Sequence, residues 1–134
     1  MAWSAPRTWT PGELVTASLL NTELRDNELY LVGDAAWTAP ALSNGWVNFA
    51  GGTQPVGYRK IGDVVHLRGC LKSGTVNTTV FTLPAGYRPL TAHIYAHVSN
   101  GALARWTINT NGTVVLTAGS NVYATLDGIA FLVT

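Results

Sequence analysis

The sequence predicts a mainly β protein: an antiparallel, jelly-roll-like β-sandwich preceded by an extended N-terminal arm and one short helix. Apolar and polar residues alternate with a period of two beyond residue 36, and glycine-containing turns separate these runs. Charged residues make up only 11% of the 134 residues, well below the roughly 25% of ordinary soluble domains. Such a surface is typical of strands and turns rather than of exposed helices.

Residues 1–15 are expected to form an arm. Pro6, Pro11 and Gly12 interrupt any helix, while Trp3 and Trp9 offer large apolar rings with one polar N–H each. A segment this short has no core of its own in which to bury them. The two rings therefore need a partner surface, either the chain's own β-domain or another subunit.

A helix is predicted from Thr16 to about Val32, with Thr16 as its N-cap and Gly33 ending it. Its apolar side recurs with steps of 4, 3 and 4, the spacing of a short coiled coil. We expect this side to mediate oligomerisation through Leu20, Leu24, Asn27 and Leu31.

Asn27 is the polar member of that seam. A buried asparagine among leucines can fix register and copy number by bonding its symmetry mates, at a cost in stability. The alternative is a helix that lies on its own β-domain, with Asn27 at the edge of the contact.

Beyond residue 36 the alternation predicts eight or nine short strands. The clearest run is Val65–Leu71, and the Asn111-Gly112 pair between two alternating runs is a strong hairpin signal. The remaining candidates are Trp46–Phe49, Val56–Lys60, Val80–Leu83, 93–98, 103–108, 114–116, Val122–Leu126 and Ile129–Val133. So many strands in about 95 residues indicate a sandwich.

Charge divides the chain in the same place as periodicity. Residues 1–34 carry two basic and five acidic side chains, a net −3, whereas residues 35–134 carry six basic and two acidic ones, a net +4. We therefore divide the chain into an arm and helix (1–34), expected to serve attachment and trimerisation, and a β-sandwich domain (35–134). A charge of +4 spread over a hundred residues is too dilute to indicate nucleic-acid binding. No apolar run approaches the ~20 residues that span a bilayer, so membrane insertion is not expected.

The chain offers few groups for catalysis. Asp63 and Asp127 are the β-domain's carboxylates, and each is better explained as a turn residue than as one of a catalytic pair. Cys70 lies in an alternating strand, where a thiol is usually inert. His93 and His97 lie about 13 Å apart on one strand, too far to share a metal. We expect no enzyme activity, catalytic residue, cofactor or metal site.

Aromatic side chains leave one binding option open. A sugar-stacking platform could draw on several of them, although most are needed for the core of so small a domain. The candidates are Trp37, Trp46, Tyr58, Tyr87, Tyr95, Trp106 and Tyr123.

The stretch WSAPRTWTPGELVTASLLNTELRDN, residues 3–27, resembles the N-terminal segment of small virion structural proteins of tailed bacteriophages. The stretches YRKIGDVVHLRG (58–69) and LPAGYRP (83–89) resemble parts of the β-domains that follow it. The resemblance implies a homotrimer on the virion surface, synthesised in the host cytoplasm. It also implies an attachment segment that includes Trp3, Pro6, Trp9 and Pro11.

The resemblance leaves two positions on the virion. Because the helix runs into the β-domain with few residues between, we expect a capsid decoration protein or short head appendage, bound to the major capsid protein or another virion protein. The alternative is a tail-fibre or receptor-binding protein whose β-domain recognises a host-surface saccharide.

Overall fold

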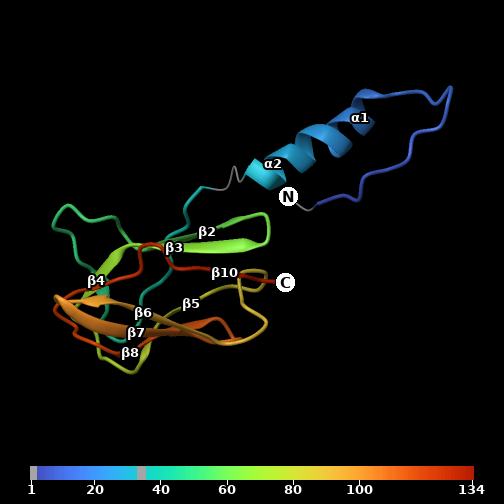
Figure 1. Ribbon diagram of the computed structural model, residues 1–134. Coiled ribbons are helices and arrows are strands. Elements are labelled where there is room, and N and C mark those ends of the chain that lie inside the picture. The colour runs from blue at the N-terminus through green and yellow to red at the C-terminus, as the bar shows by residue number, and fades with distance from the viewer. Residues whose placement is uncertain (1–2, 33–35) are drawn as a thin grey trace.

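The computed structural model describes residues 3–32 and 36–134 of the chain. Figure 1 shows a helix with an arm beside it, placed outside a β-domain of two layers. The predicted helix is confirmed as α1 (Ala17–Leu20), a π-helical segment η1 (Asn21–Asp26) and α2 (Asn27–Val32). The Thr16 hydroxyl caps it by accepting a hydrogen bond from the Leu19 N–H at 3.2 Å. Gly33 and Asp34, the predicted end of the helix, lie outside the described residues.

The β-domain consists of two antiparallel sheets of unequal size. The larger has the order β1-β4-β9-β6-β7-β8-β5, and the smaller has the order β10-β3-β2. The strands of the large sheet are β1 (Val47–Asn48), β4 (Cys70–Lys72), β5 (Thr79–Thr82), β6 (His93–Ser99), β7 (Ala102–Ile108), β8 (Thr113–Ala118) and β9 (Ala124–Thr125). Those of the small sheet are β2 (Gly57–Ile61), β3 (Val64–Arg68) and β10 (Ala130–Leu132). The prediction of a mainly β antiparallel sandwich is confirmed.

The core lies between the two sheets. Trp106 at its centre is fully buried, and its indole Nε1–H donates to the Thr125 carbonyl at 2.9 Å. That bond satisfies the polar atom that burial of a tryptophan would otherwise leave unpaired. The other large, fully buried side chains are Phe81, Leu67, Leu71, Leu83, Ile108, Leu116, Leu126, Ile129, Val65, Val80 and Val114.

One predicted strand is divided in the structure. The run Val65–Leu71 belongs to two sheets, because the chain leaves β3 and enters β4 at Gly69. Gly69 has φ +113°, and a Cβ there would lie only 2.5 Å from the Val56 Cα. The alternation continues through the bend, so periodicity alone did not reveal it.

The segment of the same chain that pairs with this strand bends at the same level. β9 pairs with β4 and β10 pairs with β3, so this two-stranded ribbon passes from the large sheet to the small one. At the bend the Gly69 N–H donates to the Asp127 carboxylate and the Leu126 N–H donates to the Gly69 carbonyl, both at 2.8 Å. These bonds satisfy backbone groups that the interrupted ladder would leave unpaired. We call this bend the Gly69 corner.

The Gly69 corner gives a test of the fold. Gly69→Ala should lower the free energy of unfolding by at least about 3 kcal/mol, because a left-handed φ and a clash with backbone act together. Gly86→Ala is the matched control: Gly86 also has positive φ, +85°, but nothing lies within 4 Å of a Cβ there. It should cost only about 1 kcal/mol. Equal losses in urea unfolding of the two variants would contradict the close approach at Gly69.

Candidate functional site

The arm folds back along the helix through one polar contact. The Asn27 side-chain oxygen accepts hydrogen bonds from the Ser4 N–H (3.0 Å) and hydroxyl (3.2 Å). Its NH₂ group donates to the carbonyls of Ser4 (3.1 Å) and Glu23 (3.2 Å). Asn27 is accordingly 5% exposed, the one buried residue of the described helix. Its amide acts as a clasp between arm and helix.

This placement bears on the predicted oligomerisation seam. The Asn27 amide uses both donors and both acceptor positions inside its own chain, so bonding to a symmetry mate would require the clasp to open. Leu20, Leu24 and Leu31 are 43%, 55% and 61% exposed and do not share its environment. The π-helical turn between them also changes the angular spacing that a coiled-coil stripe assumes. Oligomerisation through the leucines remains a prediction.

The arm residues keep exposed apolar surface. The Trp3 ring lies 6.2 Å from that of Tyr30 and remains 46% exposed, while Trp9 is 42% exposed with the Arg7 guanidinium over it at 4.8 Å. Pro6 and Pro11 are exposed as well. Trp3 therefore packs back on its own helix in part, and attachment through these four residues remains a prediction.

The two carboxylates of the β-domain each accept a hydrogen bond from a residue far away in the sequence. Asp127 accepts the Gly69 N–H at the corner, and Asp63 accepts the Tyr30 hydroxyl at 2.5 Å. The second bond raises the pKa of Tyr30. It also joins the end of α2 to the β2–β3 turn, where the Gly62 N–H donates to the Tyr30 carbonyl at 3.2 Å. Both aspartates therefore act in the architecture of the chain.

The remaining chemistry-bearing side chains are also engaged. Burial raises the pKa of the Cys70 thiol, which keeps it protonated near neutral pH. His97 contacts the Thr125 hydroxyl (2.9 Å) and the Asp127 carbonyl (2.8 Å), and His93 stacks beside Tyr95. Within residues 3–32 and 36–134, no three His, Cys, Asp or Glu side chains are grouped to hold a metal. In the same part of the chain, no helix is long and apolar enough to cross a bilayer.

The predicted aromatic platform does not form. Trp46, Tyr58 and Trp106 are core residues. Tyr95 is half-buried, with its hydroxyl donating to the Ala130 carbonyl at 2.8 Å. The half-buried Trp37, Tyr87 and Tyr123 belong to separate clusters, in each of which a cationic side chain lies over an aromatic ring.

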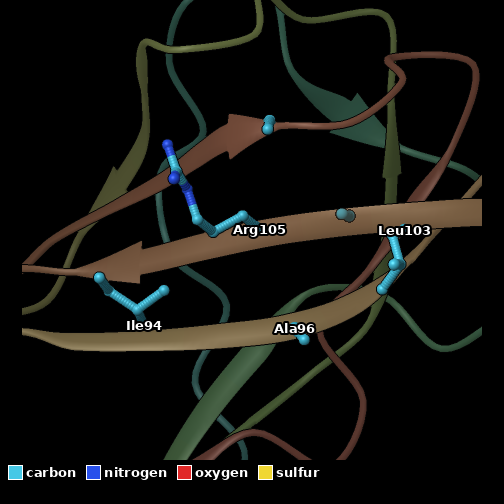
Figure 2. Close-up of a pocket in the computed structure, with 6 residues that line it drawn as sticks. Ile94, Ala96, Leu103 and Arg105 are labelled. Atoms are coloured by element: carbon cyan, nitrogen blue, oxygen red, sulfur yellow. The ribbon is translucent and has the colours of Figure 1, made fainter.

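An apolar hollow lies on the outer face of the large sheet, where Figure 2 shows its lining. Ile94 and Ala96 of β6 and Leu103 of β7 point outward, and Ile94 and Leu103 are 69% and 80% exposed. The hollow measures about 390 Å³ and is also lined by Ala104, Arg105 and Ala118. Sequence reasoning missed it because the alternation along β6 does not show which face turns outward, and the apolar set Ile94, Ala96 and Val98 is the exposed one.

The outer face of the small sheet carries the opposite chemistry. Arg59 and Arg68 place their guanidinium carbons 4.6 Å and 4.5 Å from the centre of the Trp37 ring. Sequence reasoning missed this group too, although a signal was present. The Gly62-Asp63 turn sets a hairpin register in which Arg59 and Arg68 fall on one face.

The clasp predicts the effect of substituting Asn27. Asn27→Leu should speed amide hydrogen exchange in residues 3–9 and 17–32 about tenfold, because the lost hydrogen bonds contribute on the order of 1–2 kcal/mol net. Asn21→Leu, an exposed asparagine on the same helix, is the control and should leave exchange unchanged. Slower exchange or a higher melting temperature in Asn27→Leu would instead support a seam asparagine that costs stability.

Comparison with known proteins found similarity among solved structures. No family model matches the chain, and no curated protein matches it either. Among solved structures, it is similar to the receptor binding protein (gp15) of Listeria phage PSA, with 22% sequence identity and a TM-score of 0.64. The alignment covers 87% of this chain and 77% of that one. At this identity the match establishes a shared fold. The alignment covers a larger share of the chain than residues 36–134 make up, so the shared fold extends beyond the β-domain.

Proposed function

We propose that the chain is a non-enzymatic receptor-binding protein of a bacteriophage tail, whose β-domain contacts the host surface. The observation that carries the proposal is the fold likeness to the gp15 receptor binding protein over most of both chains. Two independent features support it. The N-terminal stretch resembles phage virion segments, and Asp63, Asp127 and Cys70 have structural surroundings rather than those of a catalytic site.

This proposal takes the tail-fibre alternative in preference to capsid decoration. The capsid expectation rested on how few residues separate the helix from the β-domain. A solved structure that shares this fold is a receptor binding protein, which favours the tail alternative. Localisation on the virion surface is common to both readings and is part of the proposal.

We also propose that the chain forms a homotrimer attached through its N-terminal segment. The exposed apolar side chains of residues 3–32 support this part of the proposal. Leu14, Leu20, Leu24, Leu31 and Val32 are all at least 43% exposed. So many exposed apolar side chains on and just before one short helix are typical of a surface that a partner covers. The partners would be two further copies of the chain and another tail protein.

Receptor binding predicts competition. Purified full-length chain, added to host cells before the phage that carries it, should reduce phage adsorption at least tenfold at saturating protein, because both compete for one set of receptors. Heat-unfolded protein is the control and should leave adsorption unchanged. Adsorption that stays complete while labelled chain fails to stain the cells would contradict the proposal.

The attachment role makes a separate prediction. Trp3→Ala/Trp9→Ala should still stain host cells but should lose incorporation into virions, because buried tryptophans commonly contribute 2 kcal/mol or more each, roughly 30-fold in affinity. Thr8→Ala, an exposed residue of the same arm, is the matched control. Both proteins would be supplied to a phage lacking the gene, with virion content measured by immunoblot. Normal incorporation of the double variant would place attachment elsewhere.

A further inference from the structure

The β2–β3 hairpin brings two arginines together on its outer face. Arg59 stands opposite His66, and Arg68 stands opposite Gly57, the next pair on the same face. Both guanidinium carbons lie within 4.6 Å of the centre of the Trp37 ring. Because both contact one ring, the two guanidinium carbons lie at most 9.1 Å apart, the sum of 4.6 Å and 4.5 Å.

Backbone pairing fixes this arrangement. Thr38 pairs with Tyr58 through hydrogen bonds of 2.9 and 3.0 Å, which sets Trp37 beside the outer face of β2. Gly57 leaves the space in which the ring meets the second arginine. A Cβ on Gly57 would lie 3.3 Å from the Arg68 Nε and 3.5 Å from a Trp37 ring carbon. The group is therefore built by the sheet and not by a mobile loop.

The two charges have no acidic partner in the described residues. Both ion pairs of residues 3–32 and 36–134 lie in the N-terminal segment, as Arg7–Glu13 and Arg25–Asp26. The Nε atoms of Arg59 and Arg68 are buried without a hydrogen-bond partner. Neither guanidinium donates a hydrogen bond within residues 3–32 and 36–134, so the two terminal NH₂ groups of each side chain keep up to four N–H donors for a ligand.

We propose that Arg59 and Arg68 bind an oxyanion of the host receptor, namely a phosphodiester or carboxylate group of an anionic cell-surface polysaccharide. This inference rests on the proposed receptor-binding function and specifies its ligand. Guanidinium groups match the paired oxygens of phosphate and carboxylate, and a bound anion would offset the repulsion between two like charges. Trp37 supports the two guanidinium groups and is not a platform for stacking sugars. The net +4 of residues 35–134 would steer such a polymer toward the domain.

The test uses the immobilised full-length chain and three soluble polymers. Poly(glycerol phosphate) teichoic acid carries phosphodiesters, polygalacturonate carries carboxylates, and dextran is neutral. Biolayer interferometry should show binding to at least one anionic polymer, weakening as sodium chloride is raised, and no binding to dextran. The anionic polymer that binds more tightly identifies the class of oxyanion.

Substitutions test whether polymer binding depends on Arg59 and Arg68. Arg59→Gln and Arg68→Gln should each weaken binding at least tenfold, and Arg68→Lys should weaken it by less, because the charge remains while the two-pronged geometry is lost. Arg105→Gln is the matched control: it removes the same charge from the large sheet, where the Arg105 Nε–H donates to the Thr117 hydroxyl at 2.9 Å. It should change binding less than twofold. Thermal unfolding of every variant checks that the fold is retained.

Two outcomes would overturn the inference, and each is distinct from failure of the receptor-binding function. The chain could stain host cells while Arg59→Gln and Arg68→Gln stain them equally. The glutamine variants could change the oligomeric state in light scattering, which would make the pair a subunit contact. If the wild-type chain bound neither cells nor polymers, the proposed function itself would be contradicted.

Discussion

The close approach of backbone at Gly69 is the constraint on which the β-domain depends. The ribbon formed by β3–β4 and β9–β10 passes there from one sheet to the other, and a side chain at Gly69 would meet the Val56 backbone. Asp127 completes the corner by accepting the Gly69 N–H. Without this bend the residues of β3 and β4 would form one long strand of one sheet. The small sheet would then have no separate outer face on which Arg59 and Arg68 could meet.

The two faces of the sandwich differ in chemistry for reasons that lie in strand register. On the small sheet, the hairpin register places cationic side chains beside one another and Trp37 against them. On the large sheet, β6 directs Tyr95 inward and leaves Ile94 exposed. The first face suits a charged polymer, whereas the second is an apolar hollow. The N-terminal segment, with its clasp at Asn27, meets the β-domain at the β2–β3 turn through Tyr30 (Figure 1).

Much of the fold could be predicted from the sequence, because period-two alternation and glycine turns are local signals. The Asn111-Gly112 hairpin was predicted in this way, and the Thr16 cap was predicted from the helical pattern that follows it; both are confirmed. The Gly69 corner was not, since alternation continues through a change of sheet. Three of the four bonds of Asn27 join it to Ser4, 23 positions away, and leave no local pattern. The arginine pair was missed because the two residues were considered separately, although the turn at Gly62-Asp63 fixes their register.

The position of the chain on the virion tests the central claim most directly. Gold-labelled antibody against the chain, imaged by electron microscopy on intact virions, distinguishes the tail tip from the capsid in one measurement. If the chain is a receptor-binding protein, gold should appear at the distal end of the tail, and virions that lack the gene should carry no gold. Gold distributed over the capsid would contradict the account and restore the decoration role.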